Sequence, residues 1–419
     1  MLQTILIKSC TIVDPHSAFN QKELDVLIID GKISKIAQNI TADALQINGK
    51  GRFLAPGFFD MNTSIGEPGL ETKEDFETGS KAAAAGGFTG LAIMPHQAPT
   101  TDSKSQVAYI INRAKGNLVD IYPYGTISQK REGIDLSEMF DMQQTGAIAF
   151  SDGNKPIQDA GLMERALLYA KGFDALILSY PEDQSIAGKA KMNEGVMSTL
   201  LGMKGIPNLA EELMVIRDLY LAEYTGAKVH FSTISTAHAV ELIAAAKAKG
   251  APVTCDVAAH HLVLTEDVLA DFDSHYKVKP PLRTQNDVNA LVKGLKDGVI
   301  DAVVSQHTPQ EIEFKEVEFE IAAYGIIGLQ TVLPLLFKAG LNAEQIVQKL
   351  AIAPRHILGL NIPQIKEGNE ANLVLFNDAE WFYTTENNYS KSANSPFINQ
   401  KLNGKVWLTC NNNQIYHSN

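Results

Sequence analysis

Residues 228–257 read KVHFSTISTAHAVELIAAAKAKGAPVTCDV, and this stretch contains one complete unit of strand, helix and strand. Its two ends, KVHFST at 228–233 and PVTCDV at 252–257, are short and mostly apolar. Such runs are typical of strands that are buried on both faces of a sheet. Residues 237–249 between them have the composition of a helix. The unit therefore predicts two parallel strands joined by a covering helix.

The same alternation recurs along the central part of the chain. The other apolar runs are FLAPGFFD (53–60), FTGLAIM (88–94), VDIYPYG (119–125), AIAFS (147–151), ALILSY (175–180) and IDAVVS (300–305). Helical stretches follow at 80–85, 104–115, 159–171, 209–224 and 287–296. Eight such strands predict an α/β fold with a closed (β/α)8 TIM-like barrel over residues 53–364. An open doubly wound sheet is the alternative, and it is disfavoured because no Gly-rich phosphate loop follows a first strand.

Both ends of the chain read as β-structure. Residues 25–30 and 32–36 flank Asp30-Gly31, a dipeptide that suits the positive φ angles of a tight hairpin turn. Apolar strands recur at 371–376, 404–409 and 414–416, with Asn411-Asn412-Asn413 as a second turn. Neither end has enough apolar residues for a core of its own. We therefore expect residues 1–52 and 365–419 to form one small composite β-sandwich.

Composition excludes several classes of protein. The 419 residues carry 36 Lys and Arg against 48 Asp and Glu, a formal charge of −12, which disfavours nucleic-acid binding through a basic face. Three cysteines cannot form a disulfide scaffold and are typical of a reducing compartment. No leader pattern and no membrane-length apolar run is present, so we expect a cytoplasmic location without membrane association.

In a barrel of this kind the chemistry lies where the strands end. The polar side chains there include few metal ligands, and those that could serve are Asp152, Glu182, Asp256, His260, His261 and His307. A catalytic zinc site needs three or more such groups at one point. Some polar residues in these strands and loops have a simpler structural interpretation. His230 suits a hydrogen-bonded core position, and Asp152-Gly153 suits a turn. The acidic segment 310–320 (QEIEFKEVEFE) suits either a lid or a solvated face.

The motifs identify the chain as similar to the dihydroorotases, in the cyclic amidohydrolase branch of the amidohydrolase superfamily. The resemblance rests on ordered matches over nearly the whole chain: APGFFD (55–60), GGFT (86–89), Met94-Pro95, NEG (193–195), HHLVLTED (260–267), KVKPPLR (277–283), YGIIGL (324–329) and SPF (395–397). It implies the barrel of the amidohydrolase type together with the two-ended β-sandwich.

The departures from the family pattern fall at the functional positions. The zinc-binding His-x-His pair of active relatives is Asn62 and Ser64 here, and two further zinc-binding histidines are Tyr180 and Thr233. The substrate-gripping arginine is Gly66, the substrate-binding asparagine is His96, and the asparagine before Pro-Pro-Leu-Arg is Lys279. The Asp-Asp pair after the fourth strand is reduced to Asp152-Gly153. The general-base aspartate is Gln306, although His307 remains, and His260 also belongs to this former pocket.

Amide hydrolysis in this family needs a metal-activated hydroxide and a carboxylate that moves a proton. Neutral side chains supply neither, so we expect no zinc and no hydrolysis. The leading hypothesis is an inactive dihydroorotase-like protein of pyrimidine biosynthesis with a structural or regulatory role. The resemblance to inactive homologues implies aspartate carbamoyltransferase as partner, and we also expect a homo-oligomer. The alternatives left open are an active dihydroorotase or a related cyclic amide or ureide hydrolase with a rebuilt site, and a module that binds such a compound without converting it.

Overall fold

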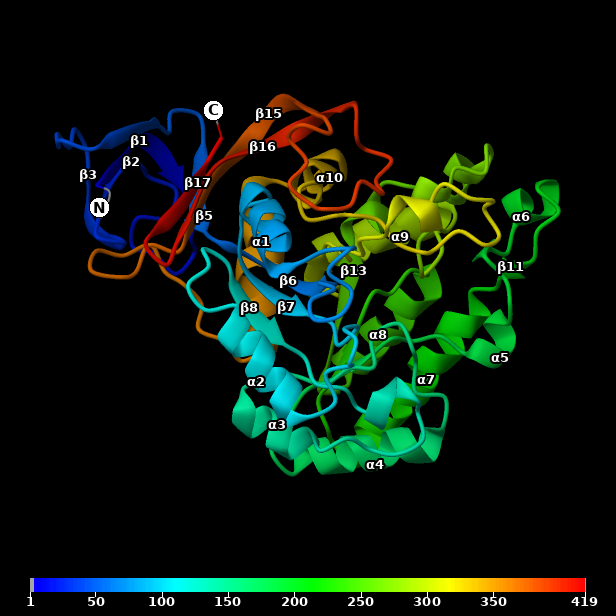
Figure 1. Ribbon diagram of the computed structural model, residues 1–419. Coiled ribbons are helices and arrows are strands. Elements are labelled where there is room, and N and C mark those ends of the chain that lie inside the picture. Colours follow the sequence, from blue (N-terminus) through cyan, green and yellow to red (C-terminus); the bar gives the residue numbers. More distant parts are fainter. Residues whose placement is uncertain (1–3, 419) are drawn as a thin grey trace.

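The computed structural model describes residues 4–418, and the two ends of the chain meet in one sheet (Figure 1). Its path runs β17-β16-β15-β5-β1-β2-β3, and β4 lies off this path and pairs with β1. The strands are β1 Ile5–Ile12, β2 Glu23–Ile29, β3 Lys32–Ala37, β4 Leu45–Asn48, β5 Phe53–Pro56, β15 Leu373–Tyr383, β16 Gln400–Asn411 and β17 Gln414–His417. Strands from both termini therefore lie in one continuous sheet, which is consistent with the expected β unit built from both ends.

Local sequence explains the two hairpins of this sheet. Asp30 and Gly31 adopt φ angles of 53° and 73° between β2 and β3, and Asn412 and Asn413 adopt 51° and 57° between β16 and β17. Only glycine and small polar residues accept this left-handed region at low cost, which is why these dipeptides mark the turns. The predicted turns are therefore present at both ends.

One predicted strand is divided in the structure. Residues 53–60 were expected to form the first barrel strand, but β5 pairs with β1 and β15 in the terminal sheet. The first barrel strand is β6, Phe58–Thr63. The two strands separate at Gly57, where a Cβ would lie 2.2 Å from the Thr89 side chain. Sequence pattern alone does not reveal such a break, because both halves are equally apolar.

The barrel consists of parallel strands in two runs that isolated bridges connect. The first run is β6, β7 (Phe88–Ile93) and β8 (Asp120–Pro123), and the second is β9 (Ile177–Ser179), β12 (Val229–Phe231), β13 (Val253–Ala258) and β14 (Ala302–Val304). Phe150 bridges Gly125 on one side and Ile177 on the other, so the expected strand at 147–151 is a single bridged position. Thr63 bridges His307 and closes the ring.

Helices surround the barrel as expected, as Figure 1 shows for α1 to α4 and α7 to α9. The α-helices are α1 Phe76–Ala85, α2 Lys104–Arg113, α3 Met139–Thr145, α4 Ala160–Lys171, α5 Gln184–Ala187, α6 Val196–Leu200, α7 Leu209–Thr225, α8 Ala237–Ala248, α9 Gln285–Lys296, α10 Val332–Lys338, α11 Ala343–Val347 and α12 Ala353–Ile357. A two-stranded element, β10 (Met192–Asn193) with β11 (Gly205–Ile206), lies in the long segment between α5 and α7.

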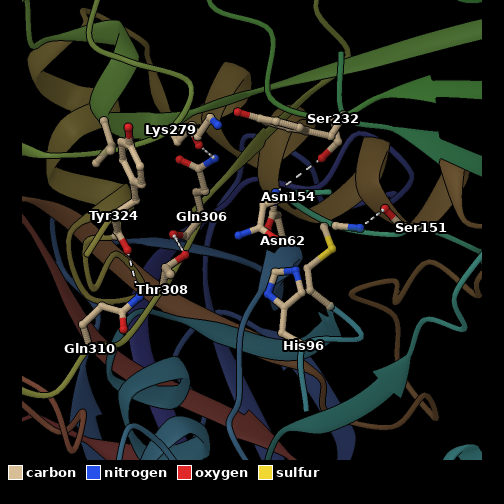
Figure 2. Close-up of a pocket in the computed structure, with 15 residues that line it drawn as sticks. Asn62, His96, Ser151, Asn154, Ser232, Lys279, Gln306, Thr308, Gln310 and Tyr324 are labelled. Atoms are coloured by element: carbon tan, nitrogen blue, oxygen red, sulfur yellow. Dashed lines mark hydrogen bonds between the residues drawn. The ribbon is translucent and has the colours of Figure 1, made fainter. Parts of the chain in front are cut away.

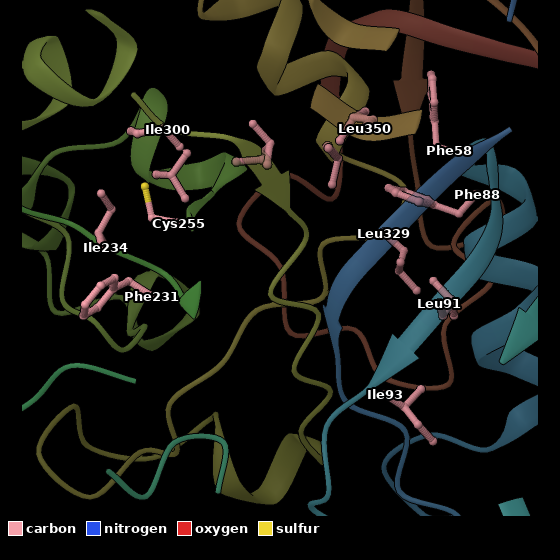
Figure 3. Packing of buried hydrophobic residues seen from close by; sticks show 14 of the residues in the cluster. Phe58, Phe88, Leu91, Ile93, Phe231, Ile234, Cys255, Ile300, Leu329 and Leu350 are labelled. Carbon is pink, nitrogen blue, oxygen red and sulfur yellow. The ribbon is translucent and has the colours of Figure 1, made fainter. Parts of the chain in front are cut away.

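The main core lies between the barrel strands and the surrounding helices (Figure 3). Phe58 and Phe88 of neighbouring strands are fully buried, with ring centroids 5.9 Å apart and an edge-on arrangement. Each buried phenylalanine contributes about 2 to 3 kcal/mol. Within residues 4–418 no helix combines the length and the apolar character needed to cross a bilayer.

Candidate functional site

A cavity of about 90 Å³ lies at the ends of the barrel strands (Figure 2). It is lined by Asn62, Met94, His96, Ser151, Gly153, Asn154, Tyr180, Ser232, Val278, Lys279, Gln306, Thr308, Gln310, Tyr324 and Gly325. Figure 2 shows Asn62, Asn154, Ser232 and His96 on one side, and Lys279, Gln306 and Tyr324 on the other. Five predicted site residues therefore line one cavity: Asn62, His96, Tyr180, Lys279 and Gln306.

Asn62 lies on β6 and connects that strand to the loop after β12. Its amide Nδ2 donates to Ser232 Oγ at 3.3 Å and to Thr233 Oγ1 at 3.2 Å. Thr233 has a φ of 62°, which is strained for a β-branched residue, and its backbone N–H donates to the buried Asp256 at 2.6 Å. Neutral partners thus satisfy one another at two positions where active relatives bind zinc.

His96 follows β7 and fills space beside Gly153. Its Nδ1 lies 3.0 Å from Ser64 Oγ, while its Nε2 is buried without a hydrogen-bond partner in the described chain. A Cβ on Gly153 would lie 2.0 Å from this Nε2. Burial lowers the pKa of His96 well below its ordinary value, so the ring is neutral and a weak base. The imidazole of His96 therefore occupies the space that a side chain at residue 153 would need.

This match gives a testable prediction for Gly153→Ala. The φ of residue 153 is 59°, so the alanine is strained, and its methyl group collides with His96. We expect the free energy of unfolding in urea to fall by about 2 to 3 kcal/mol, and His96→Ala in the same chain to recover part of this loss. Gly116→Ala is the control, because its φ is 85° and nothing lies within 4 Å of its Cβ. Equal losses for Gly153→Ala and Gly116→Ala would contradict the steric match.

Asp152 points away from the cavity. Its Oδ1 accepts hydrogen bonds from the backbone N–H groups of Ile127 and Ser128 at 2.8 and 3.1 Å, and its Oδ2 accepts from the Ser128 hydroxyl. Burial raises the pKa of this carboxyl despite these donors. Of the two interpretations of Asp152, the local structural one is confirmed, because the carboxylate anchors the neighbouring loop.

Tyr180 and Lys279 bring a phenol and an ammonium group to the cavity. Tyr180 is 8% exposed, and its hydroxyl has no hydrogen-bond partner among residues 4–418. Burial raises its pKa well above the ordinary value, so the phenol stays protonated. The Nζ of Lys279 lies 2.7 Å from Oε1 of the buried Glu182. Gln306, with a φ of 48°, donates from Nε2 to the Lys279 carbonyl at 2.9 Å.

The histidines that sequence left as candidate ligands have other roles. His230 is fully buried and contacts Asp256 at 2.9 Å and Thr254 at 2.7 Å, which confirms its interpretation as a hydrogen-bonded core residue. His261 donates to the Pro280 carbonyl at 3.1 Å. His260 is buried beside it, with ring centroids 4.6 Å apart, and lies outside the cavity lining.

His307 is a structural connector rather than a group of the cavity. Its Nδ1 accepts from the Gly328 N–H at 3.2 Å, so its Nε2 carries the proton and donates to Glu74 at 3.2 Å. Glu74 is fully buried, and it also accepts from the Ser390 hydroxyl and the Lys391 N–H. The ring therefore joins the barrel to the segment before β16. No sequence signal points to Glu74 in this role, because nothing in its neighbourhood marks it as buried.

Gly66 lies in a tight turn that backbone hydrogen bonds close. Its N–H donates to the Glu74 carbonyl, and its carbonyl accepts from Leu70 N–H at 2.8 Å. A Cβ at residue 66 would lie 2.0 Å from the Leu70 carbonyl oxygen. The backbone thus occupies the space that any larger side chain would need.

The segment after β14 covers one side of the cavity through Thr308, Gln310 and Tyr324. Two buried lysines hold it: Lys277 donates to the Phe319 and Ala322 carbonyls, and Lys315 donates to those of Ala323 and Gly325. Burial lowers the pKa of Lys315 to about 7 and that of Lys277 to about 8. The glutamates of the segment 310–320 are mostly exposed, which fits the expected solvated face, and Gln310 lines the cavity.

The side chains of this cavity do not fit a zinc ion. Zinc requires thiolate, imidazole or carboxylate ligands in a compact arrangement. The positions at which the resemblance implies zinc ligands supply an amide, two hydroxyls and a phenol, and Lys279 adds an ammonium group. Within residues 4–418 no three His, Cys, Asp or Glu side chains converge at one point.

Comparison with known proteins identifies the relatives of this chain. A family model described as dihydro-orotase-like matches residues 51–239. The chain is 41% identical to a dihydroorotase of Geotalea daltonii over 99% of both chains, and 42% identical to one of Acetivibrio thermocellus over 98% of both. Among solved structures it resembles an L-hydantoinase (dihydropyrimidinase) from Arthrobacter aurescens, with a TM-score of 0.85 at 24% identity over 100% of this chain and 96% of that one. At that identity the structural likeness shows the fold alone.

Proposed function

This chain belongs to the dihydroorotase family, and on that premise we propose that it is a member of pyrimidine biosynthesis that neither binds zinc nor hydrolyses a cyclic amide. The observation that carries the proposal is the set of side chains at the former ligand positions. Asn62, Tyr180 and Thr233 are neutral, and Asn62 and Thr233 are hydrogen-bonded to each other. A zinc ion would have to displace these contacts and would gain no anionic ligand.

Proton transfer is weakened at the same cavity. No Asp or Glu is found among its lining residues in the described chain. His96 is its one imidazole, and burial lowers the pKa of that ring well below the ordinary value. A general base works best when its pKa lies near the working pH. This argues against the alternative of a hydrolase with a rebuilt site.

The test is metal analysis together with a hydrolysis assay. We expect protein purified without chelators or added zinc to hold substoichiometric zinc, and to hydrolyse dihydroorotate no faster than buffer does. The protein should stay equally inactive after incubation with excess zinc. Stoichiometric zinc with turnover would overturn the proposal, and turnover without metal would favour the rebuilt hydrolase.

For the biological role we propose a structural or regulatory partnership with aspartate carbamoyltransferase. The support is the resemblance to inactive family members that associate with this enzyme, together with a fold that is intact around a changed cavity. We expect the carbamoyltransferase of the same organism to co-sediment with this chain at micromolar concentrations, and the chain alone to self-associate. Two independent species in analytical ultracentrifugation would contradict the partnership.

A further inference from the structure

Residues 311–321 expose large apolar side chains on the outside of the protein. Ile312, Phe314 and Ile321 are 60%, 52% and 71% exposed to solvent. An apolar residue that is exposed singly needs no explanation, but several of them in one short segment are typical of an interaction surface. The segment therefore has the apolar character of a docking surface.

A neighbouring loop, residues 267–274, extends this surface. Its Phe272 is also largely exposed, and its ring centroid lies 6.2 Å from that of Phe319 in the first segment. The hydroxyl of Ser274 donates to the Lys315 carbonyl, which joins the two segments a second time. The loop and the segment therefore form one continuous surface.

Carboxylates surround the apolar side chains of this surface, which we name the acidic–apolar face. The one lysine within the two segments, Lys315, is buried, and its ammonium donates to the carbonyls of Ala323 and Gly325. It therefore does not present a positive charge to solvent. None of the acidic residues is buried, and they are Asp267, Asp271, Asp273, Glu311, Glu313, Glu316, Glu318 and Glu320.

Two buried lysines fix the shape of the acidic–apolar face. Lys277 and Lys315 donate to backbone carbonyls between residues 319 and 325, and neither forms an ion pair with a carboxylate within residues 4–418. Burying a charge costs free energy, and these hydrogen bonds offset that cost only while the segment keeps its conformation. A surface that is ordered before binding loses less conformational entropy when a partner docks.

We propose that the acidic–apolar face docks a partner protein whose own surface carries lysine or arginine side chains around apolar ones. The sign of the charge disfavours a nucleic acid or an anionic membrane. A symmetric pair with a second copy would place these carboxylates against one another. A basic partner instead pairs with the carboxylates, while Ile312, Phe314 and Ile321 are removed from water. The inference deepens the partnership proposed above by naming its surface, and it rests on that partnership for the identity of the partner.

The test is the affinity of the full chain for the carbamoyltransferase of the same organism, measured by isothermal titration. Glu313→Gln, Glu316→Gln and Glu318→Gln together remove three exposed carboxylates that form no ion pair within residues 4–418. We expect this triple variant to keep the wild-type melting temperature and to bind about tenfold more weakly at low salt. The difference should shrink as salt is added, because salt screens exposed charges.

Matched controls change the same residue types elsewhere on the surface. Glu132→Gln, Glu138→Gln and Glu223→Gln together remove three other exposed carboxylates, and binding should stay within about twofold of the wild type. For the apolar part, Ile321→Ser should weaken binding about fivefold. Its control is Ile134→Ser, because Ile134 is 67% exposed and lies outside the acidic–apolar face.

The outcomes separate the face from the partnership. Unchanged binding in either variant of the face, or equal losses in its control, would overturn the inference and leave the partnership standing. If the carbamoyltransferase does not bind the wild-type chain, the partnership fails, and a synthetic peptide of alternating lysine and leucine then tests the face, with a glutamate and leucine peptide as control. Binding of the basic peptide alone, weakened about tenfold by the triple Glu→Gln change, would support the face. Absent or undiminished binding of that peptide, or equal binding of the acidic one, would overturn it.

Discussion

Replacing Gly66 by alanine is expected to lower the free energy of unfolding by about 3 kcal/mol. The added methyl carbon would lie 2.0 Å from the Leu70 carbonyl oxygen and 2.7 Å from its carbon, which are backbone atoms that cannot rotate away. Relief requires the 66–74 turn to open, and that breaks the hydrogen bonds from Gly66 to Glu74 and from Leu70 to Gly66. Equilibrium denaturation in urea, with circular dichroism as the signal, measures the loss.

The control for Gly66 is Gly161→Ala in the first turn of α4. The nearest atoms to a Cβ there are ends of flexible side chains at 3.3 and 3.4 Å, and alanine is the better helix former. We expect that variant to be neutral or slightly stabilised. A Gly66→Ala protein as stable as Gly161→Ala would show that the turn opens at no cost.

The clash at Gly66 also applies to larger side chains. The arginine that the resemblance to the dihydroorotases implies for this position would meet the same backbone atoms. Gly153 and His96 form a second matched pair, because a side chain at 153 would meet the imidazole. Single substitutions toward the family pattern at these positions are therefore expected to destabilise the chain rather than create a metal site.

The sequence predicted the barrel well because its signals are local. Each buried strand is a short apolar run, and several of the helices between them have their own start signal, such as the Asp159 side chain that accepts from Leu162 N–H at the start of α4. Errors arose where pairing depends on distant residues. β5 joins the terminal sheet because β1 and β15 flank it, and Phe150 makes bridges but no regular strand.

The site was predicted in part, for a physical reason. Alignment of motifs placed Asn62, His96, Tyr180, Lys279 and Gln306 at strand ends, and strand ends converge in a barrel. It could not show the direction of a side chain. Asp152 accepts hydrogen bonds from backbone N–H groups and does not line the cavity. Asn154, Tyr324 and Gln310 do line it, from loops whose course depends on the whole fold.

His307→Ala is expected to cost about 3 to 4 kcal/mol in the free energy of unfolding. Both imidazole nitrogens of His307 are engaged, with Gly328 and with the fully buried Glu74. Removing the ring leaves the buried Glu74 carboxylate with one strong donor fewer. A hydrolase with a rebuilt site would instead lose turnover in this variant while keeping its stability.

A double-mutant cycle with Glu74→Gln isolates the contact between the two side chains. Glutamine is neutral and can still form hydrogen bonds. Once His307 is absent, Glu74→Gln should therefore lower the free energy of unfolding by less than it does in the wild-type chain. The loss in the double variant should therefore fall short of the sum of the single losses by at least about 1 kcal/mol. Additive losses would mean that His307 acts through Gly328 and packing alone. Because Glu74 also holds Ser390 and Lys391, a coupled result would identify this pair as the connection that fixes the C-terminal segment to the barrel.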